Sequence, residues 1–250
     1  MEHLFEDIEI KENGIELLEQ VLKTKRKPCM IGTGSMSDPY IPLEIELNYT
    51  RKALEMIQRY GFGVTLHTKS DRVLRDLDIL KQIHRQTKAV VQMTLTTYND
   101  DLCRLIEPNV CVTSRRINAL KEFQRAGIPT VVWLCPILPF INDSEENIRN
   151  LIETCADTGV KGIINFGMGL TLRDGNREYF YTQLDKHFPG LKEQYIRYFG
   201  NAYELASPHS RELMQTFHQL CEKFGIWHDN QQIFCYLSHF EEKEIQMSLF

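Results

Sequence analysis

Short apolar runs alternate with longer segments of helical period along the first two thirds of the chain. The apolar runs are rich in β-branched residues and cover residues 29–32, 63–68, 89–96, 130–136 and 161–167. Each segment between them keeps one apolar face, as Leu47, Leu54 and Ile57 do after the first run. This alternation predicts five strand–helix steps, and therefore an α/β fold with a parallel sheet and crossover helices.

The strand pattern fades beyond residue 170 into an aromatic-rich region of helical period. No linker or low-complexity tract separates the two parts, and 250 residues with 42% hydrophobic side chains are enough for one barrel core. We therefore expect a single domain. Residues 1–170 form a partial parallel (β/α) barrel, and residues 171–250 form a helical extension packed on it.

The N-terminal segment departs from this order. A helix over residues 15–22 has the apolar face Ile15, Leu18, Val21 and Leu22 and leads into the first apolar run, as a crossover helix would. Residues 1–12 are too polar to supply the buried strand that should precede such a helix. We expect the barrel to lack its first strand, which would leave an exposed sheet edge of the kind that soluble proteins usually avoid.

Composition narrows the class of protein. With 29 basic and 34 acidic residues the net charge is −5, which gives no overall attraction to nucleic acid or to an anionic membrane. The first ten residues carry four acidic side chains and do not match a secretory signal. The longest apolar stretch, 130–141, is too short to span a bilayer. Seven cysteines without a Cys-x-x-Cys pair fit mostly buried, reduced thiols, so we expect a cytoplasmic protein.

Polar side chains collect where the predicted strands end. The carboxyl ends of barrel strands open onto one face, where functional groups cluster. The candidates at these ends are Ser35, Ser37, Asp38, Lys69, Thr94 and Thr96. They suit a zwitterionic, hydroxyl-rich ligand: Lys69 would meet a carboxylate, and Asp38 an amine or ribose hydroxyls.

Several features at the strand ends also have a plainer interpretation. Gly32-x-Gly34 lacks the third glycine of a dinucleotide-binding loop, and a tight turn is the better interpretation. Lys69 could be a solvated lysine at a helix start. Thr94 and Thr96 could be β-formers that line the barrel interior.

Several motifs together resemble a known family. They are Gly-Thr-Gly-Ser-Met-Ser-Asp-Pro-Tyr at 32–40, Thr-Lys-Ser at 68–70, Arg-Asp-Leu-Asp at 75–78, Glu-Pro at 107–108 before Ser-Arg-Arg at 114–116, Ala-Gly-Ile-Pro at 126–129 and Pro-Ile-Leu-Pro at 136–139 with Asn-Asp at 142–143. Their order and spacing resemble the spore photoproduct lyase-like branch of the radical S-adenosylmethionine (SAM) proteins. The resemblance implies that Ser37, Lys69, Thr94 and Thr96 contact SAM. It also places Ser35 where the lyase has a hydrogen-donating cysteine, so thymine-dimer repair is not expected here.

The same family carries a Cys-x-x-x-Cys-x-x-Cys motif that binds a [4Fe–4S] cluster. No three cysteines in this chain have that spacing, and by resemblance the motif would lie just before Met1. We expect a chain that has lost its beginning rather than a barrel that evolved without it. In complete form the resemblance implies reductive cleavage of SAM to a 5′-deoxyadenosyl radical, with an electron donor such as flavodoxin or ferredoxin. The chain as it stands should be inactive.

Other patterns favour structure over chemistry. His218, Cys221, Cys235 and His239 have a spacing close to that of a zinc site, but an apolar helix face beside Cys221 favours a core thiol. The basic and aromatic residues of 173–203 could bind nucleic acid, yet acidic neighbours dilute their charge. Cys135 at a strand end is either a radical-quenching thiol or a buried structural cysteine. Arg116 faces either the barrel mouth or solvent.

The leading hypothesis is thus a radical SAM protein of unknown substrate. The alternative is a non-catalytic barrel that binds a nucleoside-like ligand or a protein partner.

Overall fold

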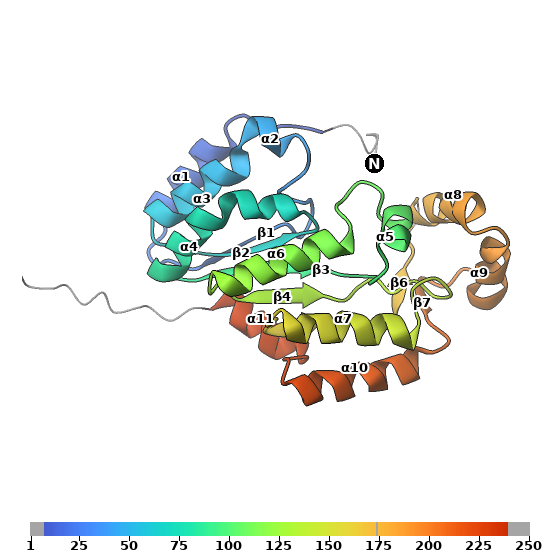
Figure 1. The fold of residues 1–250 in the computed structure, drawn as a ribbon. Helices are drawn as coiled ribbons and strands as arrows, with labels where there is room; N and C mark the ends of the chain where they lie inside the picture. The colour runs from blue at the N-terminus through green and yellow to red at the C-terminus, as the bar shows by residue number, and fades with distance from the viewer. Residues whose placement is uncertain (1–7, 174, 240–250) are drawn as a thin grey trace, which may run out of the picture.

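The computed structural model describes residues 8–173 and 175–239 (Figure 1). Its centre is a five-stranded parallel sheet in which the strands follow their order along the chain. The strands are β1 (Met30–Thr33), β2 (Gly63–Thr68), β3 (Ala89–Thr94), β4 (Thr130–Trp133) and β5 (Gly162–Ile164). This order is the one that successive right-handed strand–helix–strand units produce.

One face of the sheet is covered by the crossover helices. These are α1 (Gly14–Thr24), α3 (Tyr49–Arg59), α4 (Leu77–Gln86), α6 (Thr113–Arg125) and α7 (Glu145–Asp157), and α10 (Ser210–Phe224) packs on α7. Alternate strand residues such as Leu66, Met93 and Val132 point to these helices and form the main core with their apolar faces. Burial of this face supplies most of the driving force for folding.

The opposite face is covered by the last described helix, α11 (Asn230–Ser238), which contacts both edge strands, β1 and β5. Ile233 and Leu237 of α11 form a second core with Val90 and Val131. One helix can reach both edges only if the sheet curls around it. The predicted partial barrel is therefore confirmed.

The mainly helical extension also contains a small sheet. The sheet consists of the antiparallel strands β6 (Gly169–Thr171) and β7 (Glu204–Ala206). Between these strands the chain forms α8 (Asn176–His187) and α9 (Leu191–Phe199). In Figure 1 the arrow of β4 points toward the side where these elements gather. This part of the extension thus lies at the carboxyl ends of the barrel strands, where the sequence places the candidate site, whereas α10 and α11 of the same extension pack on the barrel itself.

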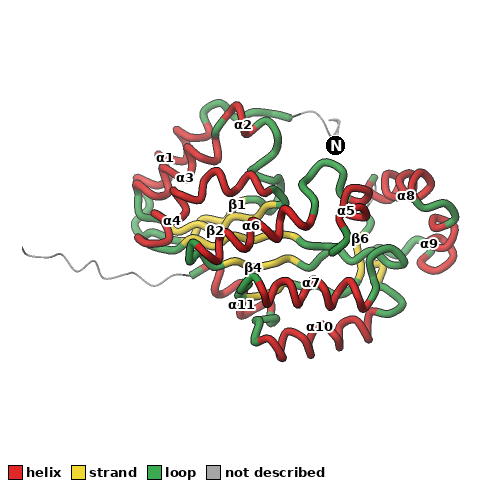
Figure 2. Tube along the Cα trace, in the orientation of Figure 1, coloured by secondary structure: helices red, strands yellow, loops and turns green. Residues whose placement is uncertain are grey.

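Short elements lie in the connections after β1, β2 and β3, and Figure 2 labels α2 and α5 among them. They are α2 (Glu44–Leu47), the 3₁₀ helix η1 (Asp71–Asp76) and α5 (Asp100–Ile106). The third and fourth strands end earlier than predicted, at Thr94 and Trp133, so Thr96 and Cys135 lie in loops. The orphan helix forms as α1, and no strand within 8–173 or 175–239 pairs with the outer edge of β1. In the same ranges, no helix is long and apolar enough to cross a bilayer.

Candidate functional site

The loops after β1 and β2 are joined through one carboxylate. Asp38 Oδ1 accepts hydrogen bonds from the Tyr40 backbone N–H at 2.8 Å and from Thr68 Oγ1 at 2.7 Å, and its Oδ2 accepts from the Lys69 backbone N–H at 2.7 Å. Three donors take up most of the acceptor capacity of this carboxylate. Asp38 therefore fixes the position of Lys69, a structural role additional to the predicted contact with a ligand amine or ribose, which stays a prediction.

The glycine turn after β1 lies directly against β2. Gly34 has φ +96°, and a Cβ atom at this position would lie 1.9 Å from the His67 carbonyl oxygen. Only glycine satisfies both the left-handed backbone and this close approach. The tight-turn interpretation of Gly32-x-Gly34 thus has its physical reason in the structure.

A buried ion-pair network stabilises the loop after β1 through Tyr40. Tyr40 is 1% exposed and donates its hydroxyl to Asp76 at 2.9 Å, and Asp76 is paired with Arg75 at 2.9 Å. Arg75 also pairs with Glu44 at 2.9 Å. A buried carboxylate is tolerated only when such partners compensate its charge. The Arg-Asp part of the 75–78 motif therefore acts through Tyr40, and does not reach the barrel mouth itself.

Ser35 and Ser37 lie at the surface of this loop. Both residues are exposed, and within the described ranges neither hydroxyl has a hydrogen-bond partner. Each hydroxyl offers one donor and two acceptor positions. Both side chains are therefore available to a ligand at the barrel mouth.

Lys69 is part of an ion-pair cluster that the sequence did not single out as a site. Its Nζ lies 2.6 Å from Glu107 Oε1, and the other carboxylate oxygen accepts from Arg116 Nη1 at 2.9 Å and from Thr96 Oγ1 at 3.2 Å. Burial works to raise the pKa of Glu107, but Lys69 and Arg116 outweigh it and hold the pKa below its usual range. Lys69, Thr96, Glu107 and Arg116 are called the Glu107 cluster below.

Arg116 is the fully buried member of this cluster. Its side chain has no exposed surface and also donates to the carbonyl oxygens of Thr94 and Cys111, at 3.0 and 2.8 Å. The suggestion that Arg116 faces solvent is therefore wrong, because the 107–116 segment folds back beneath the end of β3. Glu107 and Arg116 do occur in the motifs quoted above, but their spacing did not reveal that they pair.

Thr94 interacts with an aromatic stack on the inner face of the sheet. The His67 Nε2 and Thr94 Oγ1 atoms are 2.8 Å apart, and the His67 ring stacks on Trp133 with centroids 4.8 Å apart. Burial lowers the pKa of His67 to about 4, so the ring is neutral at pH 7. Trp133 in turn donates to Gln92, which donates to Thr65. The interior thus presents a neutral, hydrogen-bonded surface to the mouth.

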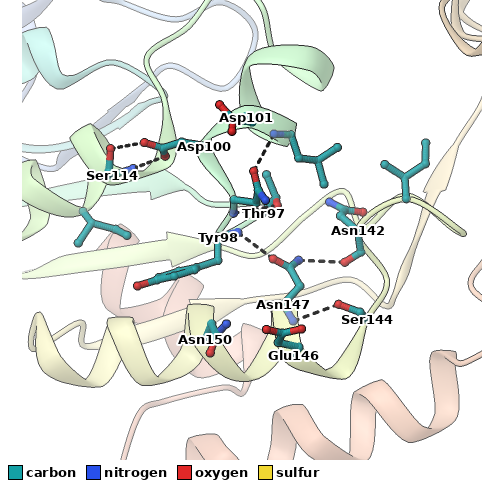
Figure 3. A pocket seen from close by; sticks show the side chains of 14 residues that line it. Thr97, Tyr98, Asp100, Asp101, Ser114, Asn142, Ser144, Glu146, Asn147 and Asn150 are labelled. Carbon is teal, nitrogen blue, oxygen red and sulfur yellow. Dashed lines mark hydrogen bonds between the residues drawn. The ribbon is translucent and has the colours of Figure 1, made fainter. Parts of the chain in front are cut away.

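Two asparagines from the segment at the start of α7 bond to the loop after β3 (Figure 3). Asn142 and Asn147 both donate to the Thr96 carbonyl oxygen, at 2.8 and 3.0 Å, and Asn147 Oδ1 accepts from the Tyr98 backbone N–H. They line a cavity of about 640 Å³ between the starts of α5 and α7. Each donor and acceptor here satisfies backbone groups that the irregular loop leaves unpaired, so these residues position Thr96.

The chain's cysteines do not match an iron–sulfur site. All seven are free, and the sequence contains no Cys-x-x-x-Cys-x-x-Cys. Within residues 8–173 and 175–239, no three His, Cys, Asp or Glu side chains form a group that could hold a metal ion. Iron–sulfur clusters are held by several cysteine thiolates brought close together. The residues present therefore do not fit a [4Fe–4S] cluster.

The four residues with zinc-like spacing also do not come together in the structure. Cys221 is buried in the main core, Cys235 is exposed on α11, and His218 packs beside His228 with ring centroids 5.2 Å apart. His239 lies within hydrogen-bond distance of Ser238 Oγ, at 2.8 Å. No tetrahedral set of ligands arises from these contacts.

The basic and aromatic residues of the extension bond mainly within it. Arg177 donates to the Ala202 carbonyl oxygen at 2.6 Å, and Lys192 pairs with Asp185 at 2.6 Å. Tyr195 is buried, with its hydroxyl on the Pro139 carbonyl oxygen. These contacts indicate that the basic and aromatic residues of 173–203 serve in packing.

Comparisons with known proteins agree on one family. The profile of the Radical SAM superfamily matches residues 6–152. An uncharacterized protein of Methanocaldococcus jannaschii is 33% identical over 136 residues, covering 54% of this chain and 49% of that protein. The Radical SAM Nalpha-GlyT isomerase of Pseudomonas phage M6 is 25% identical over 157 residues, covering 63% of this chain and 32% of that enzyme. This chain thus spans half or less of the length of these two relatives.

The fold has a counterpart among solved structures. A mutant of spore photoproduct lyase with bound AdoMet and dinucleoside spore photoproduct superimposes with a TM-score of 0.60, at 15% identity, over 86% of this chain and 64% of that one. At this identity the likeness concerns the fold. The profile match over more than half of the chain shows that this protein belongs to the radical SAM superfamily.

Proposed function

We propose that these 250 residues form the SAM-binding part of a radical SAM enzyme. The observation that carries the proposal is the Glu107 cluster, where two cations, Lys69 and Arg116, share one carboxylate. Arg116 compensates Glu107 from the buried side, so the charge of Lys69 remains for a ligand. Lysine has three donors and Glu107 uses one of them, which leaves two for the carboxylate of SAM.

The other candidates complete a polar ligand site around Lys69. The free hydroxyls of Ser35 and Ser37 would meet polar edges of SAM, and Thr94 and Thr96 retain acceptor lone pairs although their hydroxyls already bond within the protein. Support comes from the superfamily profile, and from the fold shared with a lyase structure that has AdoMet bound. In this superfamily SAM bound beside a reduced [4Fe–4S] cluster supplies a 5′-deoxyadenosyl radical.

The chain's own residues would bind and orient SAM. Asp38 and Glu107 position Lys69 from its backbone N–H and its Nζ, so the lysine is preorganised and little side-chain entropy is lost on binding. The sequence contains no Cys-x-x-x-Cys-x-x-Cys motif, and we assign these residues no part in electron delivery.

Isothermal titration calorimetry with SAM tests the proposal. We expect saturable heat for the unaltered chain and an affinity about thirtyfold lower for Lys69→Ala, which corresponds to about 2 kcal/mol for a lost charge-assisted contact. Lys121→Ala is the matched control, because Lys121 is exposed on α6. Absence of binding, or equal affinity in both variants, would reject the site and favour a barrel that does not use SAM.

A further inference from the structure

A second cavity lies between the barrel mouth and α8. It has a volume of about 320 Å³ and is lined at one end by Lys69, Thr96 and Glu107. Pro136 and Leu138 from the loop after β4 form another wall. The volume falls at the lower end of the range for small-molecule sites. The cavity therefore shares Lys69 and Thr96 with the proposed SAM site, whereas Ser35, Ser37, Asp38 and Thr94 are not among its lining residues.

One complete face of α8 forms the opposite wall. The lining residues of this helix are Asn176, Tyr179, Phe180, Gln183, Leu184 and His187. Steps of three and four residues place all of them on the same side of a helix. Of these, Leu184 and Phe180 also pack into the cluster that joins α8 to α9 and β7. The helix is thus anchored by its apolar residues, and the cavity wall is part of the folded extension.

Two polar side chains on this face have no partner. Gln183 and His187 are partly buried and line the cavity, yet within the described ranges neither has a hydrogen-bond partner. Partly buried polar groups are usually paired with protein or water. An amide and an imidazole that face a largely apolar space are suited to bind the polar edge of a ligand.

The charges around the cavity limit what that ligand is. Lys69 is the only lysine or arginine among the lining residues; it pairs with Glu107, the only carboxylate there, and its two other donors would be taken by the carboxylate of SAM. A ligand with several phosphates would need a cation for most of them. The remaining walls are aliphatic, aromatic or proline side chains with amide and hydroxyl groups between them.

We propose that this cavity binds the substrate of the enzyme, and that the substrate is an uncharged, mainly apolar small molecule with one or two hydrogen-bonding groups. Its apolar body contacts α8 and the 136–138 loop, and its polar edge meets Gln183 and His187. This inference rests on the proposed function, since it is the adjacency to the Lys69 site that makes the occupant a substrate.

A matched pair of probes tests the class of ligand. 2-Naphthol is an uncharged ring system with one hydroxyl, and 2-naphthyl phosphate is the same ring with a charged group. Titration by ligand-observed NMR should show saturable binding of 2-naphthol to the unaltered chain and binding of the phosphate at least about tenfold weaker. Equal binding of the two probes would overturn the uncharged class.

Variants of α8 test the place of binding. Gln183→Trp fills the cavity and should weaken 2-naphthol binding at least about tenfold, while Thr182→Trp, on the exposed side of the same helix, should leave it unchanged. Asn176→Trp, at the exposed first turn of α8, serves as a second blocking variant if Gln183→Trp lowers the melting temperature. Binding that survives both blocking variants in folded protein would overturn the assignment.

The SAM titration separates this inference from the proposed function. Gln183→Trp should leave the SAM affinity unchanged, and Lys69→Ala should weaken SAM binding without abolishing that of 2-naphthol. If 2-naphthol fails to bind while SAM binds, the cavity assignment is wrong and the proposed function stands. If SAM fails to bind while 2-naphthol binds, the cavity remains a ligand site but its link to radical chemistry is lost.

Discussion

The ends of the first three strands and the ends of the last two are built from different chemistry. The segments that follow β1, β2 and β3 contain Asp38, Lys69, Glu107 and Arg116, which are joined to one another or to the backbone by hydrogen bonds and ion pairs. By contrast, residues 130–142 and 162–172, around the ends of β4 and β5, contain no charged side chain. Burial there raises the pKa of Cys135 to about 11, which keeps its thiol protonated at pH 7.

This difference divides the barrel mouth into two halves. A charged half with preorganised donors favours a zwitterionic ligand, because ions are bound well only where their desolvation is compensated. The apolar half continues into α8 and the cavity beside it, where contact area decides affinity. The two proposed ligands therefore meet at Thr96 and Lys69, which line the boundary.

The strongest expected effect lies in the charged half. Arg116→Met should lower the free energy of unfolding by about 3–5 kcal/mol, because Glu107 would keep a buried charge with only Lys69 to compensate it. Guanidinium denaturation followed by circular dichroism measures the change. The neighbouring Arg115 is exposed and pairs with Asp71, so Arg115→Met should cost less than about 1 kcal/mol. Similar costs for both arginines would mean that the Glu107 cluster is not the basis of this half.

A smaller effect is expected in the apolar half. Leu205 of β7 is fully buried against Leu172, Leu184 and Tyr195. Leu205→Ala should cost about 3 kcal/mol through lost transfer free energy and the cavity left behind, and the loss should not depend on salt. Denaturation at low and at high ionic strength measures the unfolding free energy of each variant. Glu204→Ala, at an exposed position of the same strand, is the control. A strongly salt-dependent loss for Leu205→Ala would contradict the division into halves.

The smallest effect concerns pH and the neutral stack between the halves. Because the folded chain lowers the His67 pKa from 6.5 to about 4, the unfolded chain takes up this proton first as pH falls. The contribution of His67 to stability is complete above about pH 6.5 and is lost progressively toward pH 4. His67→Gln should flatten the fall in unfolding free energy across this window. His209→Gln, at an exposed site, should keep the slope of the unaltered chain.

Much of the fold could be predicted from the pattern of apolar residues. Residues 63–68 form a strand with the predicted bounds, and the predicted helix at 15–22 forms over Gly14–Thr24. A buried parallel strand and an amphipathic helix each have a period that one segment shows by itself. The five strands then follow in chain order, because short crossovers leave few other arrangements.

The partners of the site residues could not be predicted in this way. Lys69 and Glu107 are separated by 38 residues, and Asp38 and Thr68 by 30, so no local period relates them. The two-stranded sheet of the extension was missed for a similar reason, since β6 and β7 have three residues each and pair across residues 172–203.

The sequence by itself determined the parallel α/β barrel, the polar candidates at its strand ends and the absence of a three-cysteine motif. Those properties depend on residue type and short-range spacing. Only the tertiary structure decided that Asp38 and Glu107 hold Lys69 in place, that Arg116 is buried beneath them, and that one face of α8 closes a cavity beside them. Burial and charge pairing arise between segments distant along the chain, and their energies depend on the solvent that folding excludes.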